Sequence, residues 1–518
     1  MGPLVMTFDV GSQSVRAIIV DKDGNIRGSY KLAYKEICLP SSNPDYAEQD
    51  PRFYYDMICQ ASIGLKNNVS ASVMQSVKAV SITCIRDTVL ILDKDHKPLR
   101  NIITWMDRRR ASGLPKLSLF KRAVLALVGL TDSINMLYKD SFYNWIRENE
   151  PELWEKTDKF VMLPGYLNFL LTGVLKDAVA NQVGHIPLNN RKRAWMVKGF
   201  SRCVADVPIK NLIDLVETGE VIGYINSQTA ACSGIPEGLP LIATGPDKAC
   251  EALGLSVTTR EKAAISLGTA ASIQFVTPRY FEPSPFIPAF PSIIPGYFNG
   301  EDQIYRGYWI VRWFIENFCH EEVQLARSRG CEVEDILDSY LSEIPAGCDG
   351  LVMTPNMHPG MTNPHTKSIM VGLTDIHTKK HIYKAIVEGI NFELYHAMKR
   401  MERRSGQKIQ VLYAGGGGSR SDTVLQILAN VFGLPVKRTQ TNETTAIGSS
   451  LAAFVGLGEF KTYDQAASSM IHDGQVFYPD MKAHALYMDI YNGVYKNLEK
   501  SNRFYFRRLS KILLLTQR

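Results

Sequence analysis

The sequence predicts an α/β protein with two large domains. A chain of 518 residues is longer than one ordinary hydrophobic core accommodates. Two segments, 4–21 and 263–276, each combine two apolar, strand-like runs with a turn of small residues. A third segment, 410–432, places four consecutive glycines between a predicted strand and a predicted helix. The two similar hairpins indicate a duplicated architecture with one nucleotide between the halves.

Composition and charge exclude several classes of protein. Hydrophobic residues make up 45% of the chain and charged residues 21%, as expected for a globular protein. The formal charge of +6 is small beside 58 basic and 52 acidic side chains, so we expect no nucleic-acid partner. Nine cysteines form no C-x-x-C pair and are odd in number, which indicates neither a disulfide framework nor a zinc site.

No segment has the features of a targeting or membrane element. The N-terminus enters a predicted strand within four residues, without the charged and then apolar pattern of a signal peptide. No uninterrupted apolar run approaches the ~20 residues that span a bilayer. We therefore expect a cytoplasmic protein without a membrane partner.

The first hairpin, residues 4–21, ends its first strand at a carboxylate, Asp9. Its turn consists of small and polar residues: Gly11, Ser12, Gln13 and Ser14. Glycine allows a ligand to approach the backbone closely, and the serine hydroxyls with successive N–H groups suit phosphate oxygens. Asp9 would then hold the hydrated Mg²⁺ that phosphates bring. The simpler interpretation is an ordinary turn between two strands.

An Arg-Asp pair, Arg86 and Asp87, separates the predicted strands 77–83 and 89–92. Such a pair is costly to bury unless it is paired or faces a ligand. The alternatives are a ligand-facing pair and a local ion pair at a strand bulge. Residues 101–110 place Trp105 and a charged run directly after another apolar segment, and this charged run also fits a solvated helix start.

Residues 115–174 are expected to be mostly helical, with Pro151 opening one helix and Thr172 and Gly173 closing another. The aromatic cluster around Tyr138 within this layer is more typical of a core than of a ligand site. Further along, Asp247 follows an apolar strand and a Gly-Pro turn and begins a helix. Helix capping is the ordinary role of such a residue, and catalysis at the carboxyl end of a strand is the competing one.

The second half contains the other candidate nucleotide elements. The turn of the hairpin 263–276 includes Gly268 and Thr269, and the glycine run leads to a helix over 422–432. Close backbone approach to a nucleotide fits this run, whereas its spacing differs from the dinucleotide fingerprint. Four histidines between 358 and 381 do not form a convincing metal site. The basic, apolar end 503–518 is expected to be a packed or frayed extension, with a membrane-surface or partner helix as the alternative.

With these segments assembled, the chain resembles the FGGY family of carbohydrate kinases over about residues 4–500. The most specific match is SIMVGLTDIHTKKHIYKAIVE, residues 368–388, which fits the carboxyl-domain signature of the family. DVGSQSVRAIIVD and SLGTAAS resemble its two phosphate loops, TWMDRR its sugar-proximal segment, and AGGGGSRSDTVLQILANVFGLPV its adenosine loop and helix. The acceptor segment TCIRDTVLILDKDHKPL is similar to the glycerol kinase branch.

The resemblance implies two actin-like (ribonuclease H-like) ATPase domains, 1–254 and 255–500, followed by a tail, 501–518. It implies transfer of the γ-phosphoryl group of ATP, with Mg²⁺, to a small sugar or polyol. Asp247 is expected to be the catalytic base, and Asp9 and Asp247 are expected to place the metal. The expected sugar-binding residues are Arg86, Asp87, Trp105, Tyr138, Asp247 and Lys248. The expected nucleotide-binding residues are Gly11, Ser12, Gln13, Ser14, Arg16, Gly268, Thr269, Gly416, Gly417 and Ser421.

Three departures from the family pattern put the substrate in question: Lys248 after the predicted base, Phe142 in the amino-domain signature, and the Gly-Pro before Asp247. Chaperone and cytoskeletal ATPases and a catalytically silent sugar-binding regulator share the expected fold. An acid at Asp247 beside an Arg-Asp pair favours the kinase, and the presence of Asp9 with Asp247 disfavours the silent regulator. The sequence leaves open the sugar, its phosphorylated hydroxyl and a homodimeric assembly.

Overall fold

A computed structural model describes residues 2–127, 129–199, 201–284, 287–357 and 365–516. The chain forms two compact units. The first contains Met1–Thr258, Phe290–Asn299 and Glu443–His472, and the second contains Thr259–Ala289, Gly300–Asn442 and Asp473–Arg518. The boundary expected at 254/255 lies near the first of these divisions, but two later segments, 290–299 and 443–472, return to the first unit.

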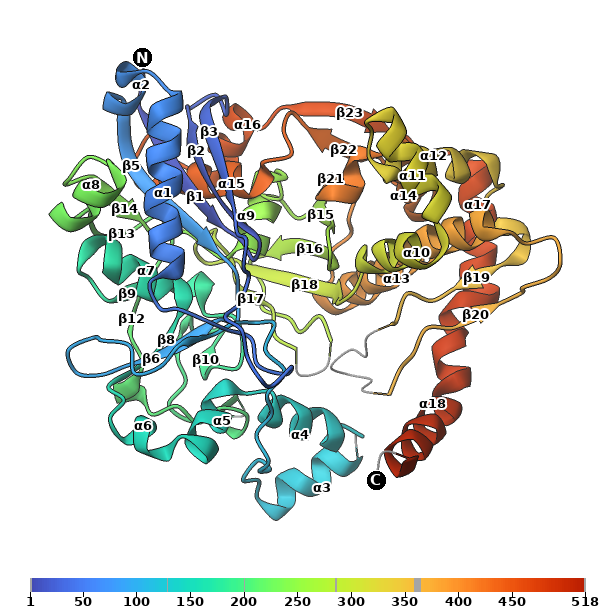
Figure 1. Cartoon of the computed structure of the whole chain (residues 1–518). Coiled ribbons are helices and arrows are strands. Elements are labelled where there is room, and N and C mark those ends of the chain that lie inside the picture. Colours follow the sequence, from blue (N-terminus) through green and yellow to red (C-terminus); the bar gives the residue numbers. More distant parts are fainter. Residues whose placement is uncertain (1, 128, 200, 285–286, 358–364, 517–518) are drawn as a thin grey trace. The chain divides into compact units, whose positions relative to one another are not determined.

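The first unit is built on a six-stranded sheet with the order β13-β14-β5-β1-β2-β3 (Figure 1). Its strands are β1 (Leu4–Val10), β2 (Ser14–Val20), β3 (Ile26–Ala33), β5 (Val77–Cys84), β13 (Val221–Tyr224) and β14 (Pro240–Ile242). The first three strands form the antiparallel meander that the sequence predicts. β5 runs parallel to β1, and β14 runs parallel to β5. The carboxyl ends of these three parallel strands therefore lie at one edge of the sheet.

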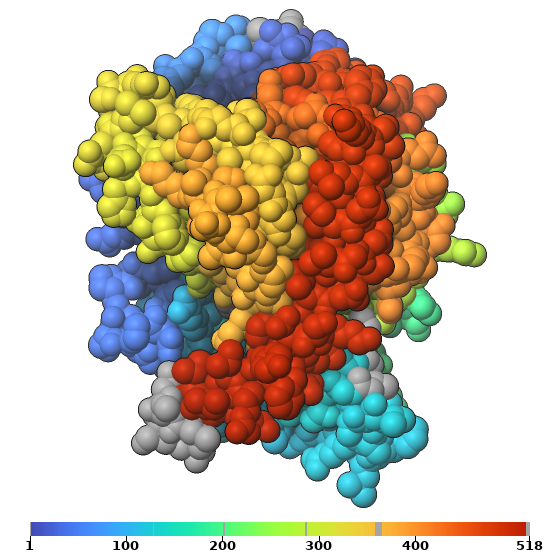
Figure 2. Space-filling view, turned by 90° about the vertical axis from the view of Figure 1, so that its right-hand side faces the viewer, coloured from blue at the N-terminus to red at the C-terminus, as the bar shows by residue number. Residues whose placement is uncertain are grey.

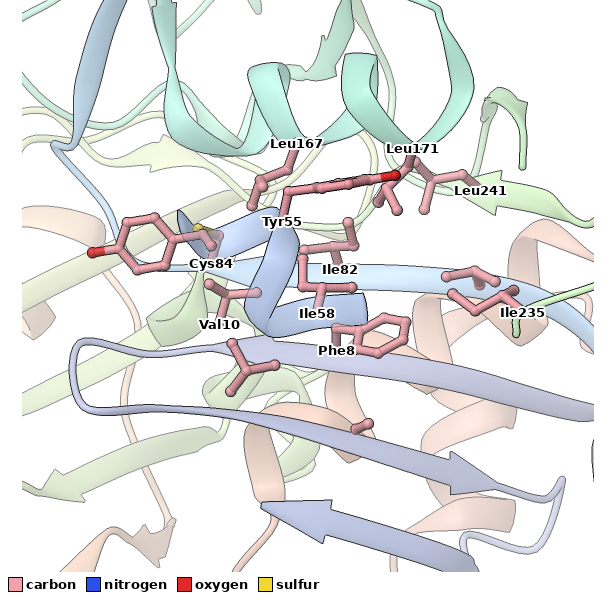
Figure 3. Close-up of a cluster of buried hydrophobic side chains, with 14 of the residues drawn as sticks. Phe8, Val10, Tyr55, Ile58, Ile82, Cys84, Leu167, Leu171, Ile235 and Leu241 are labelled. Carbon is pink, nitrogen blue, oxygen red and sulfur yellow. The ribbon is translucent and has the colours of Figure 1, made fainter. Parts of the chain in front are cut away.

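Side chains of β1 alternate between the two faces of the sheet, and each face has its own hydrophobic core. Phe8 and Val10 pack with residues of α1 (Phe53–Asn68) and α7 (Leu163–Thr172), as Figure 3 shows for Tyr55, Leu167 and Leu171. Val5 belongs to the opposite cluster, with residues of α9 (Asp247–Gly254) and α15 (Thr444–Gly456). Because successive side chains of a strand point to opposite faces, β1 contributes to both cores.

A four-stranded sheet extends the first unit with the order β4-β7-β6-β8. Its strands are β4 (Glu48–Gln49), β6 (Val89–Leu92), β7 (Ile102–Ile103) and β8 (Lys159–Met162). β8 interrupts the region expected to be helical. The sequence of β8, KFVM, is a short and mostly apolar run, whose periodicity does not distinguish a strand from a helix. Its pairing with β6 makes it a strand.

The helices of this region otherwise follow the sequence prediction, and Gly173 ends α7 in the left-handed conformation. The remaining helices of the first unit are α2 (Ala71–Gln75), α3 (Leu119–Leu127), α4 (Thr131–Lys139), α5 (Phe142–Asn149), α6 (Pro151–Glu155), α8 (Ser227–Ser233) and α16 (Tyr463–Met470). Its short strands are β9 (Lys176–Ala178), β10 (Leu188–Asn189), β11 (Ala194–Trp195) and β12 (Asp214–Val216).

The sheet of the second unit contains β18, β16, β15, β21, β22 and β23 in that order. These strands are β15 (Lys262–Leu267), β16 (Ala271–Thr277), β18 (Phe298–Ile304), β21 (Val411–Gly415), β22 (Val436–Thr439) and β23 (Asp473–Phe477), and β17 (Phe290–Pro291) pairs with the start of β18. β15 and β16 form the predicted second hairpin, and β21 runs parallel to β15. In both sheets, the first strand of a hairpin has a parallel neighbour on its other side: β5 beside β1, and β21 beside β15. This shared arrangement confirms the duplication inferred from the sequence.

Helices of the second unit are α10 (Trp309–Phe318), α11 (His320–Arg329), α12 (Val333–Glu343), α13 (Lys379–Ser405), α14 (Asp422–Phe432), α17 (Met481–Ile490) and α18 (Lys496–Thr516), with a small ladder of β19 (Val352–Met353) and β20 (Met370–Val371). Residues 501–516 of the expected tail form the end of α18, which continues from α17 through one π-helical turn, and residues 517 and 518 lie outside the described residues. Figure 2 shows these C-terminal helices, in red, along the side of this unit. Within the described ranges, no helix is long and apolar enough to cross a bilayer.

Candidate active site

Asp9 and Arg16 face each other across the first hairpin. The two residues are directly paired in the β1–β2 ladder, and Arg16 Nη1 donates to Asp9 Oδ2 at 3.2 Å. Arg16 Nε also lies 3.7 Å from Glu443 Oε2, at the start of α15. Burial raises the pKa of Asp9 to about 6; Arg16 opposes this rise, while the charges of Asp247 and Glu443 add to it. Asp9 therefore lies in a cluster of carboxylates and cations.

Asp247 is the first residue of α9, directly after Pro246 as the N-cap. Its Oδ1 accepts a hydrogen bond from the Lys248 backbone N–H at 2.8 Å. Burial raises the pKa of Asp247 above its ordinary value, although Arg86 and Lys248 oppose the shift. About a third of the side-chain surface, 32%, stays exposed. The carboxylate is thus surrounded by protein and still reachable by a small molecule.

Arg86 and Asp87 turn toward different partners. Arg86 Nε lies 3.8 Å from Asp247 Oδ1, whereas Asp87 Oδ2 lies 3.3 Å from Nδ1 of His185. Asp87 has a φ of 49°, a left-handed conformation that is uncommon outside glycine, Asn and Asp. Its carboxylate packs on Gly184, where an added Cβ would overlap Asp87 Oδ1. Arg86 is thus joined to Asp247 by an ion pair, and Asp87 is joined to His185.

The charge at Lys248 is compensated on its own helix. Lys248 Nζ donates to Glu251 Oε2 at 2.8 Å, and Glu251 is buried. A lysine and a glutamate three residues apart lie on one face of a helix, so this pair forms within α9. Lys248 was expected to bind the sugar, and this ion pair gives its ammonium group a partner within α9.

Trp105 and Tyr138 were both expected near the sugar. The Trp105 indole N–H donates to Ser12 Oγ at 2.8 Å, and its side chain is 48% exposed. This bond joins the expected sugar segment to the first hairpin turn. Tyr138 instead packs beside Gly113 and against the aromatic cluster of the helical layer.

The loop that carries Trp105 is held by a buried arginine. The Arg109 guanidinium donates to Asp107 and to Glu48 at 2.7 Å each. It also lies over the rings of Tyr46 and Trp145, at 4.0 and 4.5 Å from their centroids. Asp107 and Arg109 are thus not part of a solvated helix start, because they form an ion-pair cluster with Glu48 inside the first unit, while Arg108 and Arg110 are exposed.

The helix that carries Asp247 is positioned by unusually close packing against α15. A Cβ added at Gly254 would overlap the carbonyl oxygen of Thr444, and one added at Gly448 would overlap that of Cys250. The two helices therefore meet backbone to backbone. Since any side chain at Gly254 or Gly448 would separate them, this contact fixes α9 and Asp247 relative to the sheet.

In the second unit, the hairpin turn after β15 meets the start of α10. The carbonyl groups of Gly268 and Thr269 accept hydrogen bonds from the N–H groups of Tyr308 and Trp309 at 3.2 and 3.3 Å. The turn is therefore anchored through its carbonyl groups. Gly416 approaches the same turn closely, with a φ of 82° and Leu267 within 3.0 Å of an added Cβ.

The glycine-rich loop between β21 and α14 follows the sequence prediction. Gly417 has open space where a Cβ would stand: among the residues that the structure describes, and apart from its chain neighbours, no atom lies within 4 Å. Ser421 is the N-cap of α14: its Oγ accepts from Val424 N–H at 3.0 Å and donates to Asp338. The hydroxyl of Ser421 therefore has a structural role, whereas the position of a Cβ at Gly417 lies in open space.

Sequence reasoning missed three charged residues of the first unit. Glu443 reaches Arg16 from a segment 427 positions later in the chain, Glu251 holds Lys248, and His185 faces Asp87. Only Glu251 carried a local signal, its i, i+3 spacing from Lys248. Glu443 and His185 arrive through tertiary packing, which no local pattern reveals.

Two domain models of one protein family match most of the chain. Residues 4–254 match the N-terminal domain, and residues 263–457 the C-terminal domain, of the FGGY family of carbohydrate kinases. The uncharacterised sugar kinase YgcE of Escherichia coli K12 is 27% identical over 500 residues, 96% of this chain and 93% of its own length. Xylulose kinase of Staphylococcus epidermidis RP62A is 27% identical over 519 residues, 96% of this chain and 97% of its own.

The fold is shared with solved structures. The crystal structure of xylulose kinase from Rhodospirillum rubrum superposes with a TM-score of 0.82 at 22% identity, covering 97% of this chain and 100% of that one. This likeness confirms the predicted two-domain actin-like ATPase fold. Together with the two matched domains, it identifies the chain as a member of the FGGY family of carbohydrate kinases, enzymes that transfer a phosphoryl group from ATP to a sugar hydroxyl.

Proposed function

We propose that this kinase phosphorylates a small open-chain sugar or polyol, with Asp247 as the catalytic base and Arg86 and Asp87 as acceptor-binding residues. The observation that carries the proposal is the 3.8 Å approach of Arg86 to Asp247 at the carboxyl ends of adjacent parallel strands. Ligands of open α/β sheets bind at such strand ends.

The acceptor would bind through complementary hydrogen bonds. Arg86 offers N–H donors and Asp87 offers carboxylate acceptors, so together they fit neighbouring hydroxyl groups. Burial raises the pKa of Asp247 toward the range in which a carboxylate acts effectively as a general base. Asp247 would accept the hydroxyl proton as the acceptor oxygen bonds to the γ-phosphorus and the bond to ADP breaks.

The nucleotide phosphates would lie against the two hairpin turns, those of Gly11 to Ser14 and of Gly268 and Thr269, and the adenosine against Gly416 and Gly417. Arg16 is directed to Asp9 and Glu443 and would neutralise charge there. Closing the site around both substrates would exclude water, which otherwise competes as acceptor.

A magnesium ion fits the charge of the first unit. No group of three His, Cys, Asp or Glu side chains able to hold a metal occurs among the residues that the structure describes. Mg²⁺ keeps several waters and is commonly bound by one or two carboxylates with substrate phosphates. Asp9 and Asp247 would supply such carboxylates, and the charge of Asp247 contributes to the raised pKa of Asp9. The ion would neutralise charge on the transferring phosphoryl group.

Two observations narrow the acceptor class. Several relatives of similar length are xylulose kinases, which favours an open-chain ketose. The Arg-acid pair at residues 86 and 87 resembles the glycerol kinase branch, which favours a polyol. Both acceptors present adjacent hydroxyl groups on a flexible carbon chain, and both belong in the same test.

The proposal is tested by incubating purified protein with ATP, Mg²⁺ and a panel of ketoses, polyols and acid sugars. ADP release and the mass of the phosphorylated product are measured together. An acceptor-dependent product supports the proposal. ADP without a phosphorylated product would indicate an ATPase instead, and acceptor binding without ADP would indicate a silent sugar-binding protein.

A further inference from the structure

Two cysteines lie face to face between helices α1 and α8. Cys59 Sγ and Cys232 Sγ are 2.7 Å apart, although 173 positions separate them in the sequence. Non-bonded heavy atoms usually remain ~3.5–4.0 Å apart, and a disulfide bond measures about 2.05 Å. The two sulfurs are thus closer than an ordinary non-bonded contact, but farther apart than in a disulfide bond. Both side chains are free thiols in this structure.

The surroundings of the pair make the two thiols unequal. Cys59 is 5% exposed, whereas Cys232 is only half-buried. Burial and the neighbouring Cys232 raise the pKa of the Cys59 thiol, which lowers its thiolate population. The Tyr55 hydroxyl lies 3.3 Å from Cys232 Sγ and 3.0 Å from Thr229 Oγ1, so it holds the Cys232 side chain toward α1. A reagent in solution would therefore meet Cys232 first.

We propose that Cys59 and Cys232 form a reversible disulfide that is made by exchange with a small disulfide such as oxidised glutathione. The Cys232 thiolate attacks one sulfur of oxidised glutathione, giving a mixed disulfide and one glutathione thiolate. The Cys59 thiolate then attacks Cys232 Sγ and expels the second glutathione. The two cysteines are oxidised, glutathione disulfide is reduced, and the two thiol protons pass to the released glutathione.

The consequence is a covalent link between two helices of the first unit. α8 contacts α1, and α1 packs on β1 beside the strand end that carries Asp9. The link closes a loop that contains Arg86, Asp87 and Trp105, and closing a long loop restricts the unfolded chain strongly. Thiol pairs of this kind in a reducing environment are typically transient and redox-sensing. The oxidised form should therefore be more stable to heat.

The experiment compares reduced protein with protein treated with oxidised glutathione. Peptide mapping under non-reducing conditions should recover a linked peptide containing Cys59 and Cys232, and dithiothreitol should remove it. Oxidation should raise the Tm by roughly 5–10 °C, since a long-loop disulfide is substantial on the scale of a domain of this size. Absence of the linked peptide, with Cys232 unmodified, overturns the proposal.

Cysteine variants test whether the reaction depends on the Cys59–Cys232 pair or only on the exposure of a thiol. Cys59→Ser should stop the reaction at a glutathione adduct on Cys232, with no rise in Tm. Cys232→Ser should block the link entirely. Cys331 is exposed and serves as the control: Cys331→Ser should leave both the linked peptide and the Tm rise intact. A disulfide that joins Cys59 to another cysteine in the Cys232→Ser variant would show that the pair has no special reactivity. Disulfides between other cysteines in the native chain would show the same.

Discussion

Arg86 Nε lies 3.8 Å from Asp247 Oδ1, at the ends of two strands that are neighbours in the sheet but distant in the sequence. β5 and β14 are parallel, with Val80 beside Leu241, so the chain leaves both strands at the same edge. The guanidinium opposes the rise that burial causes in the pKa of Asp247. It therefore favours the ionised form of Asp247.

Replacing Asp247 with Asn should abolish most phosphoryl transfer. A general base contributes roughly 10²- to 10⁴-fold in rate, and an amide cannot accept the proton. The Asn side chain still accepts the Lys248 N–H bond, so the Tm and ATP binding should change little. In the native enzyme, kcat/KM should fall as the pH drops through the raised pKa of Asp247. Steady-state kinetics and calorimetry measure these quantities.

The control for this variant is Asp56→Asn, which removes an acid from the first turn of α1, outside the site. It should retain native kinetics. Near-native turnover by a stably folded Asp247→Asn enzyme would assign Asp247 to helix structure alone.

The sequence predicts those elements that depend on local patterns. Both hairpins, the helix beginning at Asp247 and the helix 422–432 follow from apolar periodicity and turn residues, and the structure confirms each of them. Fold and family follow from combining these segments. β8 was not predicted, because a four-residue apolar run is assigned by its pairing partner rather than by its own period.

Non-local packing decides the rest of the site. Arg86 and Asp87 are adjacent in the sequence, but their ion pairs lead to different partners, Arg86 to Asp247 and Asp87 to His185. Glu443 reaches Arg16 because α15 packs on β1 and α9. Strand order and helix contact place these residues together, and neither is encoded in the spacing of nearby residues.

Asp9→Asn should make the protein more stable and less active at neutral pH. Burial raises the pKa of Asp9 to about 6 from an ordinary 3.8, so the folded state binds its proton more tightly than the unfolded state. Stability from this group is therefore lost as the pH rises from about 4 through 6, at a cost on the order of 3 kcal/mol above pH 6. The variant should gain several °C in Tm at pH 7.5 and nothing near pH 4, while its Mg²⁺-dependent turnover falls.

Asp21→Asn, on the same hairpin, is a control for which we expect the opposite change in Tm at neutral pH. Despite its burial, hydrogen bonds from Asn25 and Arg27 lower the pKa of Asp21. Its ionised form therefore stabilises the fold above its unfolded pKa, and the Asn variant should lose Tm at neutral pH. If Asp9→Asn also lowers the Tm at pH 7.5, the Asp9 carboxylate is not the destabilising charge that its burial indicates.

Gly417→Val should raise the KM for ATP about tenfold or more, with an unchanged Tm. Apart from its chain neighbours, no atom of the described residues lies within 4 Å of the position a Cβ would take, so the added side chain should meet a bound ligand rather than the protein. Gly416→Ala is the matched comparison, because its added Cβ would lie 2.9 Å from the Leu267 backbone at a positive φ. That variant should lower the Tm by several °C. An unaltered KM for ATP in Gly417→Val would place the adenosine elsewhere.

The last prediction separates two roles of Asp87. As an acceptor-binding residue, its carboxylate should contribute roughly 1.5–3 kcal/mol through charge-assisted hydrogen bonds, which is about 10- to 100-fold in affinity. Asp87→Ala should therefore raise the KM for the sugar and leave the KM for ATP unchanged. Asp87→Asn should behave similarly while tolerating the φ of 49° better than Ala. Both Michaelis constants and the Tm are measured for each variant.

The competing role is the contact between Asp87 and His185, 3.3 Å apart. Burial disfavours the charged imidazole, but Asp87 outweighs this effect and raises the pKa of His185. His185→Gln removes that contact and leaves the Asp87 carboxylate in place, so it isolates the structural contribution. If Asp87 serves the sugar, His185→Gln lowers the Tm more than it raises the sugar KM, whereas Asp87→Asn does the reverse. Equal losses of Tm in both variants, with native sugar KM in each, would reduce Asp87 to a structural partner of His185.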